Sequence, residues 1–268
     1  MPTAPITTDT VIDLMEKVRQ QHPLVQCLTN AVTTNFVANA LLAAGATPAM
    51  CDGAGEAELF ARNVASGILV NVGTPHPAQI DGIREIDFAS ADTPPWVLDP
   101  VAVGALPVRT QLCAELLAER PTIIRGNASE IVALAGAGDG GRGVDSLHGA
   151  DEAADAAADL ARRTGGAVAV SGAVDLITDG TTTVRVANGD PMFGLITGGG
   201  CALGGVTAAY AAVADTPLQA AAAATAVYDI AGEIAAAQAA GPGSFQVAFL
   251  DALHNLTADD ITGKARLS

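Results

Sequence analysis

The chain has 268 residues, of which half are hydrophobic, and a formal net charge of −16. This length and apolar content are sufficient for one large α/β core, and no uncharged run reaches the roughly 18 residues that a membrane-spanning helix requires. The strong negative charge repels phosphate backbones and anionic lipids, which argues against nucleic-acid and membrane partners.

Basic residues are scarce, and the two lysines, Lys17 and Lys264, lie near the two ends of the sequence. A phosphate-binding site therefore has to rely on arginine, backbone amides and a metal ion.

The four cysteines are too far apart for a CxxC zinc site or a redox pair. Residues 1–10 contain no basic cluster followed by an apolar stretch, so the sequence predicts a cytoplasmic protein, and we expect a single domain over residues 1–268.

Five short apolar runs have the character of buried parallel strands. They are residues 24–28, 67–72, 96–99, 122–125 and 167–171. Most intervals between them are long enough for a helix, and nearly continuous apolar sequence is typical of strands that are covered by helices on both faces. The pattern predicts a doubly wound α/β protein with a mostly parallel sheet and no separate lid domain.

Helices are predicted where end signals flank an apolar pattern. They cover residues 33–44 before Gly45, residues 107–119 beginning with Pro107, and residues 217–240 before Gly241. Proline is favoured in the first turn of a helix and glycine directly after its end. These signals support helices between the predicted strands.

Two glycine-containing segments are expected to be connections. Asp179-Gly180 separates residues 176–178 from residues 183–186, which is typical of a β-hairpin, so the sheet is expected to be mixed. The run 136–143 contains a nominal GxGxxG, but it follows a helical segment instead of a strand. That context argues against dinucleotide binding and favours a surface loop.

The most distinctive local segment is residues 196–205, with the sequence Ile-Thr-Gly-Gly-Gly-Cys-Ala-Leu-Gly-Gly. We interpret it as a strand end, a glycine turn and a helix over residues 202–213. The backbone N–H groups of Gly199 and Gly200 would converge at the helix N-terminus and form a cradle for an anion. A tight turn that only needs glycine flexibility is the alternative, and spacing alone does not separate the two.

Residues 125–130 form a second candidate site, in which Arg125 ends a predicted strand and Asn127 caps the following helix. Ligands of open α/β sheets bind beyond the carboxyl ends of the strands, where the charge of Arg125 suits a phosphate. Glu130, one turn into the helix, could reach a magnesium ion or its waters. The alternative is a plain capping segment with a surface salt bridge.

Asp99 directly follows another apolar run and is a second candidate for a metal or water ligand. Asp-Pro is also a common opening of a turn, so this signal is weak by itself. Combined with the arginine, the second carboxylate and the amide cradle, it completes the set of groups that phosphoryl transfer requires. Composition alone does not name the substrate.

Several segments, in order along nearly the whole chain, resemble one known family. They are residues 28–36, 45–50, 70–74, 98–105, 125–131, 171–175 and 241–245. In these segments the chain resembles the hydroxyethylthiazole kinases of thiamin salvage, which belong to the ribokinase-like superfamily. The resemblance implies transfer of the γ-phosphate of ATP to the hydroxyl of 4-methyl-5-(2-hydroxyethyl)thiazole with Mg²⁺, by a homotrimer whose active sites lie between subunits.

The resemblance also implies roles for individual residues. Asn30, Met50 and Gly198 would line the thiazole site, Arg125 and Ser171 would contact ATP, and Asp99 and Glu130 would handle the metal. Cys201 occupies the position where sugar kinases of the superfamily carry an aspartate base. Because Cys201 lies at the start of the cradle helix, its pKa can be lowered below the ordinary value of a thiol, whereas the charge of adjacent ATP would act in the opposite direction, and a role in packing alone stays open.

This sequence departs from the family pattern at two positions. Gly199 replaces an alanine, and Ala173 replaces a glutamate near the nucleotide, which leaves metal binding more dependent on Asp99 and Glu130. A hydroxymethylpyrimidine kinase, an ADP-dependent dehydratase and an inactive nucleotide-binding sensor share much of the pattern and stay as alternatives. A dehydrogenase is not supported, because residues 28–33 lack the required glycines.

Overall fold

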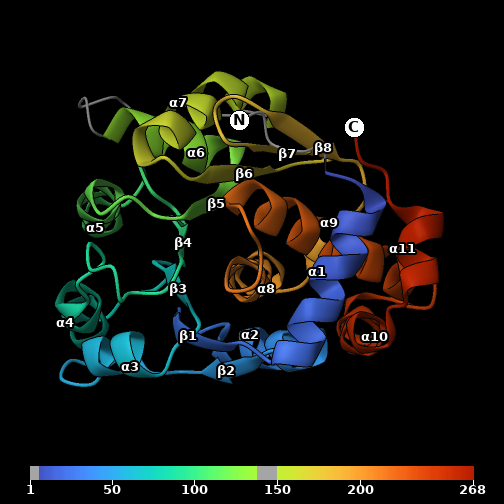
Figure 1. Cartoon of the computed structure of the whole chain (residues 1–268), viewed down its shortest axis with the longest axis horizontal. Coiled ribbons are helices and arrows are strands. Elements are labelled where there is room, and N and C mark those ends of the chain that lie inside the picture. Colours follow the sequence, from blue (N-terminus) through green and yellow to red (C-terminus); the bar gives the residue numbers. More distant parts are fainter. Residues whose placement is uncertain (1–5, 138–149) are drawn as a thin grey trace.

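An eight-stranded sheet runs through the computed structural model, which describes residues 6–137 and 150–268 (Figure 1). Its strands are β1 (Leu24–Leu28), β2 (Thr47–Ala49), β3 (Gly67–Asn71), β4 (Trp96–Asp99), β5 (Ile123–Asn127), β6 (Ala167–Ser171), β7 (Asp175–Thr178) and β8 (Thr183–Val186). They follow the order β2-β1-β3-β4-β5-β6-β7-β8. The first six strands are parallel and the last two are antiparallel additions, which confirms the predicted mixed sheet.

Helices pack on both faces of this sheet. They are α1 (Thr8–Gln21), α2 (Thr34–Ala44), α3 (Ala57–Asn63), α4 (Pro77–Glu85), α5 (Pro107–Ala118), α6 (Ala128–Ala137), α7 (Ala154–Thr164), α8 (Gly199–Ala211), α9 (Pro217–Ala236), α10 (Pro242–Asn255) and α11 (Ala258–Lys264). Two 3₁₀ helices, Ala150–Ala153 and Pro191–Leu195, precede α7 and α8. In Figure 1 the helices α3 to α7 lie on one side of the sheet and the remaining helices on the other.

Alternate residues of the central strands face two separate cores. Leu69 and Val97 pack with α1, α2, α8, α9 and α10, whereas the neighbouring Ile68 and Leu98 pack with α3 to α7. Successive side chains of a strand point to opposite faces, so a strand covered on both sides has to be apolar throughout. The fully apolar runs in the sequence therefore predicted the doubly wound architecture correctly.

Helix α8 lies directly on the sheet, against β3 and β4. Two glycines allow α8 to approach the sheet and the neighbouring helix α2 closely. A Cβ atom at Gly204 would lie 3.0 Å from Leu69 Cδ1, and one at Gly205 would lie 3.2 Å from Val37 Cγ1. The approach brings the N-terminus of α8 to the edge of the sheet where the parallel strands end.

The structure corrects two predicted boundaries. Residues 196–197 do not end a strand, because the 3₁₀ helix Pro191–Leu195 precedes them and Ile196 is an extended residue that leads into α8. The predicted helix 217–240 ends at Ala236, and α10 begins at Pro242. Strand β2 was not predicted, because it has three residues and contains a proline. Residues 138, 140 and 143 of the nominal GxGxxG lie outside the described residues.

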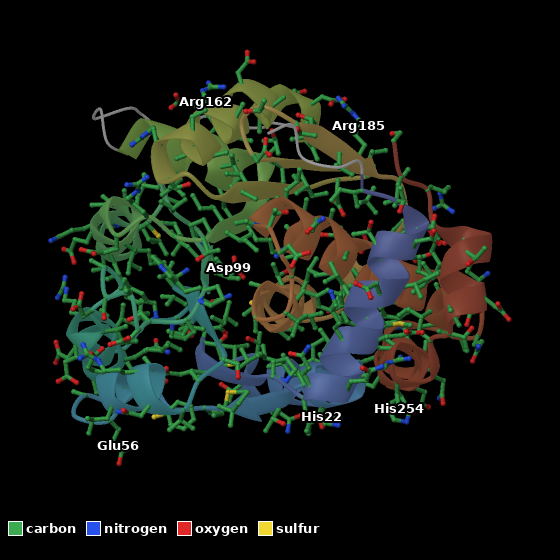
Figure 2. The ribbon with its side chains drawn as sticks, viewed as in Figure 1. His22, Glu56, Asp99, Arg162, Arg185 and His254 are labelled. Carbon is green, nitrogen blue, oxygen red and sulfur yellow. The ribbon has the colours of Figure 1, made fainter. Side chains whose placement is uncertain are left out.

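Two further findings bear on the classes of protein considered above. Within the described ranges, no helix combines the length and apolar character that crossing a bilayer requires. The side chains of His22, His76 and His254 are exposed, and His148 lies outside the described residues. Figure 2 shows His22 and His254 at the periphery and Asp99 in the interior.

Candidate active site

The predicted site residues meet at the carboxyl ends of β4, β5 and β6, below the N-terminus of α8. One cavity of about 270 Å³ is lined by eight of them: Asp99, Arg125, Glu130, Ser171, Gly198, Gly199, Gly200 and Cys201. These residues come from four separate parts of the sequence. Parallel strands bring them together because the carboxyl ends of such strands share one edge of the sheet.

The glycine cradle begins at Gly198, which is the N-cap of α8 and has a φ of 94°. Few residues other than glycine adopt this left-handed conformation. Gly200 also lacks room for a side chain, since a Cβ atom there would lie 3.0 Å from Arg125 Nη1. The N–H groups in the first turn of a helix have no partners within the helix, so this turn can bind an anion.

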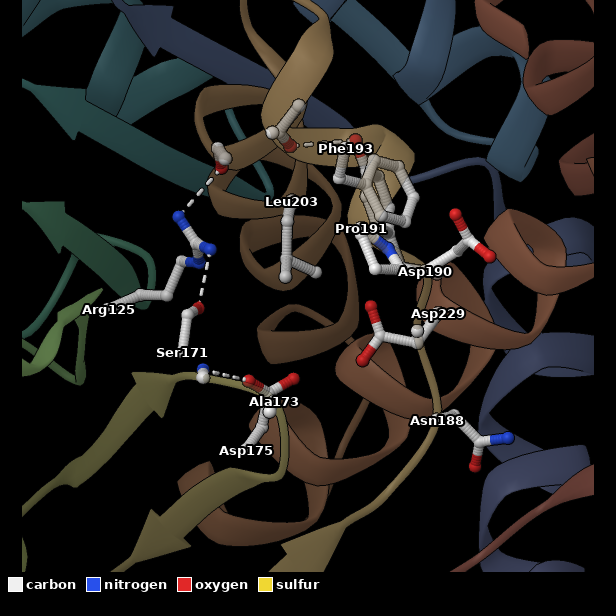
Figure 3. A pocket seen from close by; sticks show the side chains of 16 residues that line it. Arg125, Ser171, Ala173, Asp175, Asn188, Asp190, Pro191, Phe193, Leu203 and Asp229 are labelled. Atoms are coloured by element: carbon white, nitrogen blue, oxygen red, sulfur yellow. Dashed lines mark hydrogen bonds between the residues drawn. The ribbon is translucent and has the colours of Figure 1, made fainter. Parts of the chain in front are cut away.

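Arg125 is held in place by two hydrogen bonds beside the cradle (Figure 3). Its Nη1 donates to the carbonyl of Gly200 at 2.9 Å, and its Nη2 donates to Ser171 Oγ at 2.6 Å. Arg125 Nε is buried and has no hydrogen-bond partner within the described residues. The two residues predicted to contact ATP are therefore directly bonded to each other, and they fix a positive charge at the start of α8.

Glu130 links the start of α6 to the loop after β4. Asn127 Oδ1 accepts from the N–H of Glu130 at 2.9 Å, which confirms the predicted cap. In return, Glu130 Oε2 accepts from the N–H of Asn127 at 2.9 Å, and Glu130 Oε1 accepts from the N–H of Ala102 at 3.0 Å. Glu130 is thus a capping residue that also lines the cavity, with its carboxylate fixed by two backbone N–H groups.

Asp99 is a buried carboxylic acid at the end of β4. Burial raises its pKa to about 7, against the opposing effects of the Arg125 charge and a hydrogen bond from Asn71, while the charge of Glu130 raises it further. Asn71 Nδ2 donates to Asp99 Oδ2 at 2.6 Å. Asn71 was not singled out from the sequence, although a polar residue that ends an apolar strand was a usable signal.

Asn30 and Cys201 lie side by side although they are far apart in the sequence. Asn30 Nδ2 donates to Cys201 Sγ at 3.3 Å and to Asn71 Oδ1 at 3.0 Å. With the bond from Asn71 to Asp99, these contacts form one chain of polar groups from the thiol to the carboxylate. The predicted substrate residue and the predicted catalytic residue are thus connected through Asn71.

The expected lowering of the Cys201 pKa is wrong. Cys201 is the third residue of α8, but burial raises its pKa, and the nearby carboxylate of Asp99 adds to this effect. Hydrogen bonds from neighbouring side chains, among them Asn30, act in the opposite direction and are smaller. Removal of the thiolate from water therefore outweighs the favourable helix terminus, and the thiol is neutral near physiological pH.

Met50 is the one predicted residue that lies apart from this group. It follows the edge strand β2, is 36% exposed, and does not line the cavity that contains Cys201. Within this chain, Met50 and Gly198 therefore do not form one substrate site.

A larger cavity of about 430 Å³ adjoins the first (Figure 3). Four residues line both cavities: Arg125, Ser171, Gly199 and Gly200. The larger cavity also contains two buried carboxylic acids, Asp175 and Asp229, which sequence reasoning did not single out. Among the described residues, no group of three or more His, Cys, Asp and Glu side chains could hold a metal ion by itself.

Comparisons with known proteins identify the relatives of this chain. The hydroxyethylthiazole kinase family matches residues 15–259. The hydroxyethylthiazole kinase of Clavibacter sepedonicus is 56% identical over 262 residues, covering 97% of this chain and 95% of the relative. That of Granulibacter bethesdensis is 50% identical over 260 residues, covering 97% of this chain and 94% of the relative.

Solved structures give the same result. The hydroxyethylthiazole kinase from Pyrococcus horikoshii has a TM-score of 0.89 and 35% identity, covering 97% of this chain and 98% of that one. A pyridoxal kinase from Staphylococcus aureus has a TM-score of 0.59 at 18% identity, covering 76% of this chain and 86% of its own, and shares the fold alone. With an alignment to close relatives over nearly its full length, this chain belongs to the hydroxyethylthiazole kinase family.

Proposed function

We propose that this protein transfers the γ-phosphate of ATP to the hydroxyl group of hydroxyethylthiazole, as a step of thiamin biosynthesis. One observation carries the proposal: the glycine cradle, Arg125 and Cys201 line one cavity in a chain that is 56% identical to a hydroxyethylthiazole kinase. The cradle and the arginine would bind the transferred phosphate. The alcohol of the acceptor would then lie beside Cys201, at the first turn of α8.

Phosphoryl transfer depends mainly on positioning and on charge neutralisation. The N–H groups of Gly199 and Gly200 and the guanidinium of Arg125 would bind the phosphate oxygens. The bond from Arg125 to Ser171 supports this role, because a guanidinium that is already fixed loses little entropy when phosphate binds. These groups supply positive potential without a lysine.

The residues present fit a magnesium ion that is bound together with ATP. Mg²⁺ in nucleotide sites commonly takes one or two carboxylates, with phosphate oxygens and waters as its other ligands. Asp99 has an oxygen, Oδ1, to which no group in the described ranges donates, and it lines the cavity. Both oxygens of Glu130 already accept backbone N–H groups, so Glu130 would act through a metal-bound water. The ion would neutralise charge on the phosphates.

Cys201 would contribute as a weak general base or as a contact to the acceptor alcohol. Its pKa is raised by burial, so little thiolate exists near neutral pH. The transition state of phosphoryl transfer is loose, and the attacking hydroxyl keeps its proton until late. A weak base is therefore sufficient for this reaction. Asn30 would orient the thiol through its hydrogen bond to Sγ.

The proposal includes a homotrimer with active sites between subunits. A partner could supply the Met50 that lies outside the Cys201 cavity within one chain. A second support is a groove beside the cradle, whose lining includes Val32, Phe36 and Leu195. Val32 is 66% exposed and Leu195 is 65% exposed, and apolar side chains that gather at one exposed groove are typical of an interaction surface.

We further propose that residues 1–268 act as a single kinase domain in the cytoplasm, where ATP is available. The support is one sheet that connects the first strand to the last. Both cavities of the site are built on that sheet and on α8, so a separate lid is not needed to assemble the site.

A coupled assay of ADP release with a panel of alcohols tests the function. We expect turnover with hydroxyethylthiazole at a kcat/KM well above that for hydroxymethylpyrimidine and sugar alcohols. A preference for the pyrimidine would assign the chain to a sibling kinase. Absence of turnover with every alcohol, together with ATP binding, would indicate an inactive nucleotide-binding protein.

A further inference from the structure

The larger cavity has an apolar wall and an acidic end (Figure 3). The wall includes Pro191, Phe193 and Leu203. Phe193 stacks on Tyr228 at a ring distance of 5.1 Å and meets Phe245 edge to face at 5.2 Å. Gly232 permits this packing, because a Cβ atom there would lie 2.3 Å from Phe193 Cε2. The wall is therefore a fixed aromatic surface, which suits a flat ring.

The acidic end is formed by Asp175 of β7 and Asp229 of α9, which are 7% and 6% exposed. Burial and the nearby charge of Asp175 raise the pKa of Asp229, so the two carboxyl groups interact. Asp175 Oδ1 accepts from the N–H of Gly172 at 2.7 Å. Asp229 Oδ2 is buried and has no hydrogen-bond partner within the described parts of the chain. Figure 3 shows the Asp229 carboxyl group in the middle of the cavity, with Arg125 and Ser171 on one side.

A buried carboxylate oxygen without a donor is unfavourable, so such a group usually has a partner that is absent from the empty site. Two neighbouring buried carboxyl groups do not both ionise readily, so the pair carries one negative charge when it retains one proton. This charge repels a phosphate group. A neutral N–H or O–H donor fits Asp229 Oδ2 without repulsion.

We propose that the Asp175–Asp229 pair is the subsite for the nucleoside end of the phosphate donor, where Asp229 accepts a hydrogen bond from an N–H or O–H group of the nucleoside. This inference rests on the proposed function, because it assumes a nucleotide in the site. The residues shared by the two cavities fix the direction in which the nucleotide lies. The phosphates lie at the cradle and Arg125, and the nucleoside extends along Phe193 to the acidic pair.

Two groups of ATP have the required chemistry: a ribose hydroxyl and the exocyclic amine of adenine. Calorimetric titrations without the acceptor alcohol separate them. The ligands are ATP, 2′-deoxyATP, 3′-deoxyATP and purine riboside triphosphate, which lacks the amine. We expect the wild-type protein to bind one of these analogues about 10- to 100-fold more weakly than ATP, the effect of losing one hydrogen bond to a charged group.

The variant Asp229→Leu removes the acceptor and keeps a side chain that branches at Cγ. We expect it to bind ATP as weakly as the wild-type protein binds that analogue, and to bind ATP and the analogue equally. Inorganic tripolyphosphate, which lacks a nucleoside, should bind both proteins equally. Asp229→Asn keeps a neutral acceptor and should lose less affinity, and it serves as the test if the leucine variant does not fold.

Asp190→Asn is the matched control. Asp190 lines the same cavity, but its Oδ1 already caps the helix Pro191–Leu195 by accepting from the N–H of Met192 at 2.9 Å, a role that asparagine retains. The control removes the same charge from the cavity, and we expect it to discriminate the analogues as the wild-type protein does. An equal loss in the control would show a general effect of charge and overturn the inference.

Three other results would also overturn the inference. The first is an unchanged affinity of Asp229→Leu for ATP, and the second is full retention of analogue discrimination in that variant. The third is an ATP affinity that depends on K⁺ in the wild-type protein but not in Asp229→Leu. That result would assign the pair to binding a cation. Failure of the proposed function would give a different result from failure of this inference. If the wild-type protein discriminates the analogues but does not phosphorylate hydroxyethylthiazole, the subsite stands and the acceptor assignment is wrong.

Discussion

The side-chain amide of Asn71 donates a 2.6 Å hydrogen bond to Asp99 Oδ2. Asn71 in turn accepts from Asn30 Nδ2 at 3.0 Å and from the N–H of Gly73 at 2.9 Å. Its orientation is therefore fixed, and the Asp99 carboxyl group that it holds lines the cavity. The amide positions a buried carboxylate that has no charged partner at hydrogen-bonding distance within the described ranges.

Replacement of Asn71 tests this positioning role. We expect Asn71→Ala to lower kcat by about 10- to 100-fold and to raise the concentration of Mg²⁺ needed for half-maximal activity, because one lost buried hydrogen bond costs about 1–3 kcal/mol. Steady-state kinetics at varied Mg²⁺ measure both effects. The control is Asn39→Ala on the surface of α2, whose side-chain amide, among the described residues, donates only to Asn35. A stability loss with unchanged kinetics would limit Asn71 to a structural role.

Arg125→Ala is expected to raise the KM for ATP and to lower kcat, because the variant loses the fixed guanidinium beside the cradle. Arg125→Lys should recover little of this loss, since one ammonium group cannot reproduce the two directed bonds to Gly200 and Ser171. Initial rates at varied ATP measure the change. Wild-type kinetics for the alanine variant would mean that Arg125 supports the fold and that the phosphates bind elsewhere.

For Cys201→Ala we expect kcat to fall by about 10- to 1000-fold, the scale of one general base, while the affinities for ATP and the thiazole change little. Cys201→Asp should stay active, because a carboxylate can accept the same proton. Kinetics and calorimetry on both variants separate catalysis from binding. If Cys201→Ala keeps the wild-type kcat, the thiol only packs beside Asn30.

The acidic pair also predicts how stability depends on pH in the ligand-free protein. Burial raises the pKa values of Asp175 and Asp229 above their ordinary values; for Asp229, the charge of Asp175 adds to the rise and that of Arg125 opposes it. The folded state therefore holds a proton that the unfolded chain has lost. This contribution is fully present below the ordinary pKa of aspartate and is lost as the pH rises through the folded pKa.

We thus expect the free energy of unfolding to decrease as the pH rises above about 4, the ordinary pKa of aspartate, by at most about 1.4 kcal/mol per pH unit for each proton. Asp229→Asn should show a flatter profile, because it removes one titrating partner. Asp99, whose pKa is also raised, contributes to the pH dependence of both the wild-type protein and the variant. The difference between the two profiles therefore isolates the contribution of the Asp175–Asp229 pair. Denaturant titrations at several pH values measure it, and parallel profiles would contradict the shared proton.

The proposed trimer can be tested at the groove beside the cradle. We expect Leu195→Asp to shift the protein from trimer to smaller species in light scattering, and to reduce activity at low protein concentration. The control is Leu42→Asp, which changes a leucine that is 56% exposed. Leu42 lies near the C-terminal end of α2, whereas Phe36 of the groove lies near its N-terminal end. A dilute monomer with full activity would contradict the shared active site, and the assignment as a kinase would stand.

Local sequence determined the architecture and much of the candidate site. The apolar runs identified β1, β4 and β6 with their observed bounds, because strands covered on both faces have to be apolar throughout. The cap between Asn127 and Glu130 was predictable because both residues belong to one helix turn. The hairpin of β7 and β8 followed from Asp179-Gly180 for the same reason. Each of these features depends on neighbours within a few residues.

The tertiary structure alone decided which distant groups meet and how burial changes them. Asn30 contacts Cys201 across 171 positions, and Asp175 meets Asp229 only because β7 packs against α9. The pKa of Cys201 was predicted in the wrong direction, because its helix position is visible in the sequence whereas its burial beside Asp99 is not. Desolvation and charge–charge distances depend on the whole packed chain, so no local pattern contains them.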